Sequence, residues 1–562
     1  MAAHARSLDN DITRLKPANK MLGLGLMGIG LVAIVVALLF SLFVLHDDRP
    51  GEHVIHYDGA QRFFWAYLFG ITGFLAISCS ALMFTLINHL VRAGWVVNVR
   101  RVLETIAFQL PLLSILLIPI VATVVAQNGL IYSWAVPTTT PIAHHGDSHD
   151  NAGGHGESHD APHGNEKPHP QDKAAHQSDT GDTNQATAQD DASKQAKDVS
   201  ADHGGAVPAD PGDGERREPQ GPTKNEQGQV TAVDPSAGGT PRKEVQTDAV
   251  GHEMSDREGK TPGIAYPNEQ VRPGVERHYD PLIAGKTSFW LNPIIWAIRI
   301  PIYFIILSVV AWHYYKQSVK QDATGDIDIS TNLMTLSAPL TFVCGLLVTF
   351  VAFDVFMSLD PHWFSTMYGV YFFATGTQAL WAVMALTFIV LQKRGYVRQS
   401  VTEEHYHDMG KWLWAFIVFF AYIAFSQYML QWYANLPEET FWYDKRGYSS
   451  AHPNGYTPLV FWGLFVGRLV IPFLGLVSRH VKRNKFGLGF WAVWLLVMFF
   501  VDIYHLIMPE YTYTPLFGIP EILCLIGFAG LWGGNIIRTL ATAELRPVRE
   551  PRAHESLALQ HF

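Results

Sequence analysis

Ten runs of predominantly apolar residues constrain this chain more than any other feature of its sequence. A run of about 20 residues rises about 30 Å as an α-helix, which matches the hydrocarbon thickness of a lipid bilayer. A helix also satisfies every backbone polar group inside lipid. We therefore predict an all-α integral membrane protein with ten transmembrane helices, at about residues 21–45, 63–88, 102–126, 291–314, 337–357, 370–391, 412–436, 458–477, 486–507 and 519–540.

The polar segments divide the chain around these runs. Residues 1–20 form an N-terminal tail, 21–137 hold the first three helices, 286–540 hold the other seven, and 541–562 form a C-terminal tail. No small-residue cleavage site follows the first run, so it is interpreted as an anchor rather than a removed signal peptide. Lys and Arg are concentrated in the segments on one side of this topology, which predicts that both tails are cytoplasmic.

Residues 138–285 interrupt the helices with a segment rich in His, Asp, Gly, Pro, Gln and Lys. This composition lacks hydrophobic periodicity and cannot bury enough apolar surface to offset the entropy lost on ordering, so we predict a disordered periplasmic insertion. The nine histidines between His144 and His203 fit a metal-binding tract. They also fit a solvated linker with a histidine bias, which is the interpretation that we favour.

The cysteines and the charge distribution exclude several functions. Cys79, Cys344 and Cys524 all lie within apolar runs and form no CxxC or CxxCH motif. The sequence therefore offers neither a c-type haem site nor the thiolates of an iron–sulfur cluster, and we predict no metal or redox centre in this chain. The formal net charge is −9, and no basic cluster indicates nucleic-acid binding.

Two of the apolar runs contain an aspartate, Asp354 in the fifth and Asp502 in the ninth. A charge at the centre of a spanning helix costs at least about 2.5–3.5 kcal/mol, so such a residue is a functional candidate by default. Aligning the two aspartates also aligns Pro361 with Pro509. This repetition predicts an internal duplication, with spans two to five and six to nine as two four-helix bundles and the first and tenth helices beside them.

Further ionisable residues cluster near the outer ends of the predicted helices. Carboxylates, histidines and arginines at that depth are the components of a proton relay, because burial and a neighbouring cation shift proton affinity in opposite directions. Asp354 and Asp502 also fit interhelical ion pairs with the arginines, and for His362 and His505 a structural role is the more ordinary interpretation. The predicted proton path comprises Asp354, Asp360, His362, Asp502, His505, Glu510, Glu521, Glu438, Arg299 and Arg468.

The seventh predicted span ends in a polar and aromatic stretch. Ser426, Gln427, Gln431 and Asn435 recur at helical spacing, which predicts a polar stripe facing the bundle. Such a stripe fits a water path, a quinone cavity or close helix packing. The neighbouring aromatic residues fit an interfacial belt at the membrane surface, namely Trp432, Tyr433, Trp442 and Tyr443.

Two motifs carry a resemblance to a known family. Residues 358–369 read SLDPHWFSTMYG, and residues 425–440 read FSQYMLQWYANLPEET. With these motifs the spanning regions, about 20–135 and 286–540, resemble the NrfD/PsrC-like polytopic membrane subunits of alternative complex III, a bacterial quinol:cytochrome c oxidoreductase. The resemblance does not extend to the histidine-rich insertion, where such subunits have a compact periplasmic loop.

The resemblance implies a location in the bacterial inner membrane and assembly with a second, ActC-like membrane subunit. It also implies periplasmic iron–sulfur and multihaem cytochrome c partners, so haem c and the iron–sulfur clusters would belong to those subunits. In such complexes the quinol site is generally placed in the ActC-like subunit. The resemblance therefore leaves open whether a quinone such as menaquinone binds this chain, and whether a terminal oxidase is attached.

These observations together predict a membrane subunit of a quinol-oxidising respiratory complex, which provides a proton path to the periplasmic side and scaffolds the complex. Two other functions fit the same pattern. Secondary transporters also have duplicated bundles and buried charges, although their substrate sites usually lie at the midplane between broken helices. A purely structural membrane scaffold is the other alternative.

Overall fold

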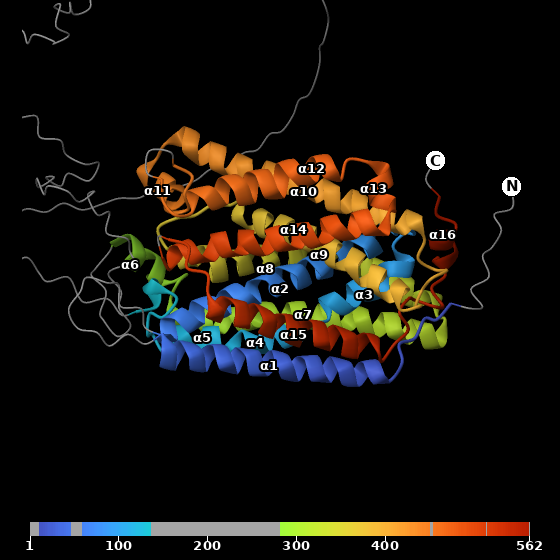
Figure 1. Ribbon diagram of the computed structural model, residues 1–562. Coiled ribbons are helices and arrows are strands. Elements are labelled where there is room, and N and C mark those ends of the chain that lie inside the picture. Colours follow the sequence, from blue (N-terminus) through green and yellow to red (C-terminus); the bar gives the residue numbers. More distant parts are fainter. Residues whose placement is uncertain (1–10, 46–58, 137–280, 450–452, 513, 561–562) are drawn as a thin grey trace, which may run out of the picture. The chain divides into compact units, whose positions relative to one another are not determined.

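The computed structural model describes 11–45, 59–136, 281–449, 453–512 and 514–560 of the 562-residue chain (Figure 1). All of these residues belong to one of the two compact units of the chain, formed by 1–143 and 262–562. The predicted insertion, 138–285, lies outside the described residues except for its last five. There the helix α6 (Pro281–Ser288) begins, so the prediction of disorder is wrong for those five residues.

Within the described part, nine helical segments are long and apolar enough to cross a membrane. They coincide with nine of the ten predicted spans, so the chain is an all-α protein with the helices of a multi-pass membrane protein. The segments are α1 (Ala18–Val44), α2 (Gly59–Leu90), α3 to α5 (Val97–Val125), α7 (Pro293–Thr324), α8 with η2 and η3 (Ile327–Leu359), α9 (Tyr368–Lys393), α10 (Glu403–Ala434), α14 with η5 (Lys485–Glu510) and α15 (Ile519–Leu540).

The remaining predicted span, 458–477, is a shorter apolar helix, Leu459–Gly475. It consists of the π-helix η4 (Leu459–Val470) and the α-helical turn α12 (Ile471–Gly475), and the short helix α13 (Arg479–Arg483) follows. A tenth apolar helix is therefore present at the predicted place, but it is shorter than the other nine.

Capping residues fix both ends of α7 and the start of α8. The Asn292 side chain accepts hydrogen bonds from the first backbone N–H groups of α7, and Gly325, at φ +68°, ends this helix. Asp326 then caps the start of α8 by accepting from the backbone N–H of Asp328. Because the turn is this short, the two helices run antiparallel, which brings the beginning of α7 beside the end of α8.

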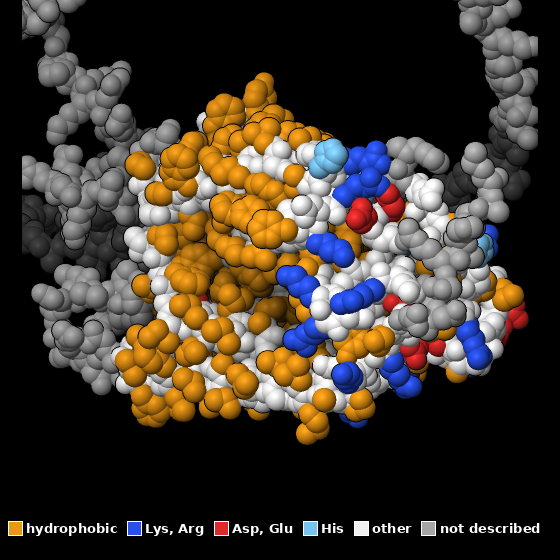
Figure 2. Space-filling model, turned by 45° about the vertical axis from the view of Figure 1, so that its right-hand side comes forward, with side chains coloured by type: hydrophobic (Ala, Val, Ile, Leu, Met, Phe, Trp, Pro, Cys, Tyr) orange, Lys and Arg blue, Asp and Glu red, His pale blue; other side chains and the backbone are white. Residues whose placement is uncertain are grey.

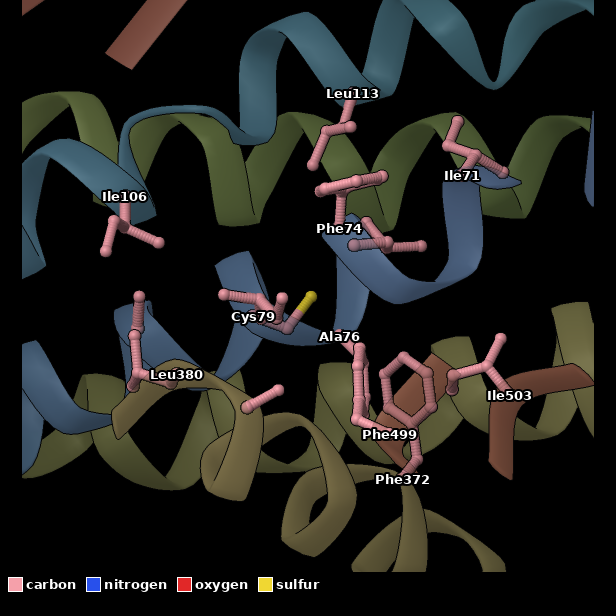
Figure 3. Close-up of a cluster of buried hydrophobic side chains, with 14 of the residues drawn as sticks. Ile71, Phe74, Ala76, Cys79, Ile106, Leu113, Phe372, Leu380, Phe499 and Ile503 are labelled. Carbon is pink, nitrogen blue, oxygen red and sulfur yellow. The ribbon is translucent and has the colours of Figure 1, made fainter. Parts of the chain in front are cut away.

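The centre of the described unit is formed by α2 and α9, which pack against each other (Figure 1). α2 also packs on α3 and α8, and α9 packs in the same way on α10 and α14. α7 packs on α8 as η4 packs on α14. Figure 3 shows the apolar core between these helices, to which α2 contributes Ile71, Phe74 and Cys79, α9 contributes Phe372 and Leu380, and α14 contributes Phe499.

Glycines join α1 to α15 along their length. A Cβ on Gly30 would lie 2.5 Å from the carbonyl oxygen of Gly527, and one on Gly23 would lie 2.5 Å from that of Gly534. Cβ atoms essentially never approach another heavy atom within 3.0 Å, so a larger residue at these positions would force the helices apart. The first and last long helices are thus in backbone contact.

The helices end at two chemically different sides. α6 and α11 (Pro437–Lys445) lie at one end of the helices, which we call the α11 end (Figure 1). α13 and α16 (Ala553–Leu557) lie at the opposite end, which we call the α16 end. Figure 2 shows Lys and Arg side chains gathered toward the α16 end and hydrophobic side chains covering the flank of the helices. On this face the exposed Lys and Arg side chains therefore lie mainly toward the α16 end.

Candidate functional site

Asp354 lies on the π-helical segment η2 (Ala352–Phe356) at the end of α8 and is fully buried. Arg299 of α7 donates two hydrogen bonds to its carboxylate, from Nε to Oδ2 at 2.8 Å and from Nη2 to Oδ1 at 2.9 Å. The Trp290 Nε1 donates to the same Oδ1 at 2.9 Å, and the Trp296 Nε1 donates to the backbone carbonyl of Asp354 at 2.9 Å. The guanidinium group of Arg299 also stacks over the Trp290 ring. Arginine and tryptophan side chains thus clamp this carboxylate.

Asp502 lies on α14 and is also fully buried. The Arg468 Nη1, on η4, lies 2.5 Å from its Oδ2. Two side chains on successive turns of α9 complete the site: the Tyr371 hydroxyl donates to Oδ1 at 2.5 Å, and the Thr375 hydroxyl donates to Oδ2 at 2.9 Å. This carboxylate is therefore held by two hydroxyl groups and one arginine.

Arg468 has hydrogen-bond acceptors besides Asp502. Its Nε donates to Gln378 Oε1 at 3.0 Å, and its Nη2 donates to the Thr375 hydroxyl oxygen at 2.5 Å. The guanidinium carbon lies 3.6 Å from the centre of the Phe420 ring, within the range of a cation–π interaction. Arg468 therefore keeps several favourable contacts that do not depend on the charge of Asp502.

The two ion pairs occupy matching places in the chain. One joins the fourth and fifth predicted spans, and the other joins the eighth and ninth. The interhelical pairing that the sequence left open is therefore present for both aspartates. Each pair also has one member on a π-helical segment, Asp354 on η2 and Arg468 on η4. Such segments are rare and occur frequently at functional sites.

A buried charge cluster lies at the α11 end. Lys445 contacts the Glu510 carboxylate, and the Arg446 Nη2 lies 2.9 Å from Glu510 Oε1. Burial acts to raise the pKa of nearby Asp360, but its hydrogen bond with His362 and the charges of Lys445 and Arg446 outweigh burial and lower that pKa to about 2. Asp360 is therefore a carboxylate at neutral pH.

A small cavity lies between the Asp502 site and this cluster. Its volume is about 10 Å³, which is at the lower limit for one water molecule. Tyr371 lines it, and so does His505, whose Nε2 donates to the backbone carbonyl of Arg446 at 2.9 Å. Gln427 and several aromatic side chains, including Tyr443, complete its wall. The cavity thus has polar groups that can bind water, but it is too small for a quinone ring.

Glu521, another predicted path residue, lies apart from this site. Glu521 forms a separate pair with Arg62 of α2 at 2.8 Å, and its carboxylate also accepts from the backbone N–H of Gly518 at 2.8 Å. The side chain of Glu438 lies outside the described residues. The structure therefore brings Asp360, His362 and Glu510 into one cluster, places His505 beside it, and leaves Asp354 and Glu521 in pairs of their own.

The polar stripe of the seventh span is only partly internal. Gln427 and Gln431 are buried, and Gln431 Oε1 accepts from the Trp363 Nε1 at 3.0 Å. Asn435 is exposed, and it ends α10 in the left-handed conformation. The predicted stripe thus reduces to two buried glutamines, of which Gln431 binds Trp363.

The interfacial-belt prediction is wrong for Trp442 and Tyr443, because both side chains are buried. Trp442 stacks on Trp363 with the ring centres 4.0 Å apart. The guanidinium carbon of Arg446 also lies over the Trp442 ring, 3.5 Å from its centre. The Trp442 and Tyr443 rings therefore pack beside the charge cluster inside the protein instead of contacting lipid headgroups. Trp432 and Tyr433 are exposed, as an interfacial position requires.

Sequence reasoning missed several residues of the site. Lys445 and Arg446 lie in the sequence between two predicted spans, yet the structure buries both against Glu510. Tyr371, Thr375 and Gln378 were not singled out, although their spacing of four and three residues places three polar side chains on one face of α9. That spacing in a spanning helix was the feature that could have identified them.

A second buried charge network, also not predicted, lies at the α16 end. Arg100 Nε lies 2.9 Å from Glu104 Oε1, and Arg100 Nη2 donates to Glu550 Oε2 at 2.8 Å. Arg101 Nη2 donates to Asp322 Oδ2 at 2.7 Å. The C-terminal segment that contains Glu550 is thereby bound to the start of α3.

Among the described residues, no three His, Cys, Asp or Glu side chains form a group that could hold a metal ion. No protein-family model matches the chain, and no curated protein matches its sequence. The functional conclusion therefore depends on the geometry of the sites and on the sequence motifs.

Proposed function

We propose that this chain is an ActF-like membrane subunit of a quinol:cytochrome c oxidoreductase of the alternative complex III type, and that Asp502 belongs to a proton path to the periplasmic side. In this proposal the protein lies in the bacterial inner membrane with both tails cytoplasmic. The α16 end is then the cytoplasmic end and the α11 end is periplasmic. The gathering of Lys and Arg at the α16 end supports this orientation.

The proposal includes ten spanning helices in two four-helix bundles. The contacts of α2 with α3, α7 and α8 support the first bundle, and those of α9 with α10 and α14, together with η4 on α14, support the second. α1 and α15 then flank the bundles as a pair. The matching ion pairs of Asp354 and Asp502 support an origin by duplication.

The observation that carries the proton path is that Tyr371 and His505 line the same cavity. The Tyr371 hydroxyl binds Asp502 on one side of this cavity. On the other side His505 donates to the backbone of Arg446, whose side chain pairs with Glu510. One water molecule in the cavity would connect the Tyr371 hydroxyl, and through it Asp502, to His505, which lies beside the charged cluster at the α11 end. Carboxylates and histidines are suitable acid–base groups for such a relay.

The chemistry of the proposed complex requires an outward proton path. Quinol oxidation releases two protons for every two electrons, so protons have to leave the membrane region. Asp502 can accept one of them because Arg468 keeps Thr375 and Gln378 as acceptors when the carboxylate becomes neutral. A buried arginine left without any partner would cost several kcal/mol instead.

Arg299, in contrast, directs two hydrogen bonds to the Asp354 carboxylate itself, and its one other hydrogen-bond acceptor among the described residues is the backbone carbonyl of Trp290. We therefore assign Asp354 to holding α7 and α8 together. The quinol site and the redox centres are assigned to partners: an ActC-like membrane subunit, and periplasmic iron–sulfur and multihaem cytochrome c subunits. The small size of the cavity beside Tyr371 supports placing the quinol elsewhere.

Purification of the full-length chain from its native membrane in a mild detergent tests this assignment. We expect co-purifying subunits that mass spectrometry identifies as an iron–sulfur protein and a multihaem cytochrome, with a haem c absorption spectrum. The purified complex should also oxidise a quinol analogue and reduce cytochrome c. A chain that purifies intact and alone, without haem absorption, would overturn the proposal.

A purely structural membrane scaffold is the second candidate. The observation that favours it is that both buried aspartates are already ion-paired in the structure. In a scaffold the pairs would only hold helices together, and neither aspartate would exchange a proton. Full turnover and full proton release by an assembled Asp502→Asn complex would therefore favour the scaffold over the proton path.

A further inference from the structure

A second cavity lies at the α16 end and takes no part in the proposed proton path. Its volume is about 90 Å³, so it has room for several water molecules or one small polar group. It lies where the end of α2, the beginning of α8 and the C-terminal segment meet. Asn88 of α2, Ser330 and Thr331 of α8, and Arg552 of the C-terminal segment line it.

Arg92 adds a positive charge to this cavity, whose wall also contains the Glu550 carboxylate, and Glu555 lies near enough to interact with Arg92 electrostatically. The other two arginines in its wall are neutralised, Arg100 by Glu104 and Glu550, and Arg552 by Glu555. The guanidinium group of Arg92, in contrast, forms no salt bridge within the described part of the chain, and its side chain is mostly exposed.

The backbone at Arg92 is fixed in an unusual conformation. Its φ is +52°, in the left-handed region that few residues other than glycine adopt, and its carbonyl oxygen accepts a hydrogen bond from the Arg552 side chain. The hydrogen bond from Arg552 of the C-terminal segment therefore holds the Arg92 backbone in place. This keeps the Arg92 side chain beside the cavity.

Asn88 supplies an unused hydrogen-bond donor. Its side chain is 7% exposed, and its Nδ2 has no hydrogen-bond partner among the residues that the structure describes. Leaving a buried donor unpaired costs about 1–3 kcal/mol, so an acceptor from outside the chain is expected here. His89, the next residue, also lines the cavity, and its Nε2 comes only within 3.8 Å of the Glu104 carboxylate.

We propose that this cavity binds a phosphate group, with Arg92 and Asn88 as its ligands. A phosphate oxygen accepts from the Asn88 amide, and its negative charge pairs with the Arg92 guanidinium group. The positive end of the α8 dipole faces the same cavity, because Ile327, Ser330 and Thr331 belong to the first turns of that helix. Basic pockets between spanning helices on the cytoplasmic side are typical sites for phospholipid headgroups.

The source of the phosphate is either a phospholipid or soluble phosphate. Ala93, Val97 and Met334 line the cavity together with the polar groups, so the wall is partly apolar. An apolar wall suits the glycerol and acyl portions of a lipid, whereas soluble phosphate would leave it in contact with water. The site is independent of the proton path, so it stands or falls separately from the proposed function.

The full-length protein, purified in detergent and depleted of lipid, tests the proposal. Phosphatidylglycerol is titrated in mixed micelles, with diacylglycerol as a lipid that lacks phosphate, and inorganic phosphate is titrated separately. Binding is measured by native mass spectrometry and by the shift in melting temperature. We expect one phosphatidylglycerol site, no comparable binding of diacylglycerol, and a dissociation constant about tenfold higher in Arg92→Gln.

Two further variants make the result specific. Asn88→Asp keeps the size of the side chain but replaces the donor with a carboxylate, and we expect it to weaken binding at least as much as Arg92→Gln. Arg394→Gln removes an exposed arginine at the end of α9, outside the cavity wall, and should leave binding unchanged. Competition by millimolar inorganic phosphate would identify soluble phosphate as the ligand. Equal binding by wild type, Arg92→Gln and Asn88→Asp would overturn the proposal.

Discussion

The sites of Asp354 and Asp502 occupy matching places in two halves of the chain but differ in their donors. At Asp354, one arginine makes two hydrogen bonds to the carboxylate and a tryptophan makes a third. At Asp502, two hydroxyl groups bind the carboxylate, and one of them, Tyr371, also borders a cavity. The comparison teaches that an ion pair alone does not define a role. The groups around the pair decide whether a buried carboxylate can exchange its proton or only hold two helices together.

The largest expected difference between the two sites is in turnover. Asp502→Asn in the assembled complex should lower quinol-dependent reduction of cytochrome c by about 100-fold, because removing an acid–base group typically costs 10²–10⁴ in rate. Asp354→Asn should change turnover less than about twofold, by the same principle, since no proton passes through it. The measurement is steady-state turnover of purified complexes with verified subunit content. Equal losses in the two variants would contradict the distinction.

The two arginines should both contribute to stability, unlike the two aspartates in turnover. Arg299→Gln leaves Asp354 buried without its main partner and should lower the free energy of unfolding by about 3–5 kcal/mol. Arg468→Gln should also destabilise the protein, by a similar amount, because each carboxylate keeps hydrogen-bond donors: Asp502 keeps the Tyr371 and Thr375 hydroxyls, and Asp354 keeps the Trp290 Nε1. Unfolding in detergent, followed by circular dichroism, measures both. The double variant Arg299→Gln with Asp354→Asn should recover most of the loss, and no recovery would show that the pair is not what Arg299 stabilises.

The tyrosine beside each aspartate provides a smaller test. Tyr371→Phe removes the hydroxyl that connects Asp502 to the cavity, and it should reduce turnover several-fold, to about the extent expected for losing one hydrogen-bonded relay group. Tyr303 lies beside Asp354 and is the matched control, so Tyr303→Phe should leave turnover unchanged. Proton release measured with a pH-sensitive dye should follow the same order. A Tyr371→Phe complex with normal proton release would exclude this cavity from the path.

The smallest expected effect is on how stability depends on pH, and it concerns Asp360, which follows η3 (Met357–Leu359). The pKa of Asp360 falls from its ordinary value of 3.8 to about 2 in the folded protein, so folding is stabilised when this group is ionised. That contribution, about 2 kcal/mol, is fully present above about pH 4 and is lost as the pH falls from about 4 to about 2. Asp360→Asn should lack this part of the pH dependence, measured by unfolding at several pH values. Asp328→Asn, at an exposed aspartate of the other end, should retain it.

Much of the fold could be predicted because it depends on local properties of the sequence. The length of an apolar run fixes where a helix can span a membrane, and nine long helices lie at the predicted places. The depth of Asp354 and Asp502 follows from their positions in those runs. The shortness of the Leu459–Gly475 helix could not be predicted, since composition does not reveal that its hydrogen bonds follow a π-helical pattern.

The environment of the site depends on contacts between distant segments, which the sequence does not show. Lys445 reads as a loop cation, but the fold buries it against Glu510, 65 residues away. Arg100 reads as a basic flank, yet it binds Glu550, 450 residues further along the chain. Whether Asp354 and Asp502 are paired, and by which donors, was open for the same reason. A charge near a helix end can be recognised from the sequence, whereas its partner requires the tertiary structure.

The backbone contact between α1 and α15 has a consequence for biosynthesis. α15 (Ile519–Leu540) lies far beyond α1 (Ala18–Val44) in the chain, so this partner of α1 is translated long after α1 itself. Throughout that interval the nascent α1 has only lipid, or a chaperone of the insertion machinery, against its glycine face. We therefore expect α1 to complete its packing only after Ile519–Leu540 has been translated.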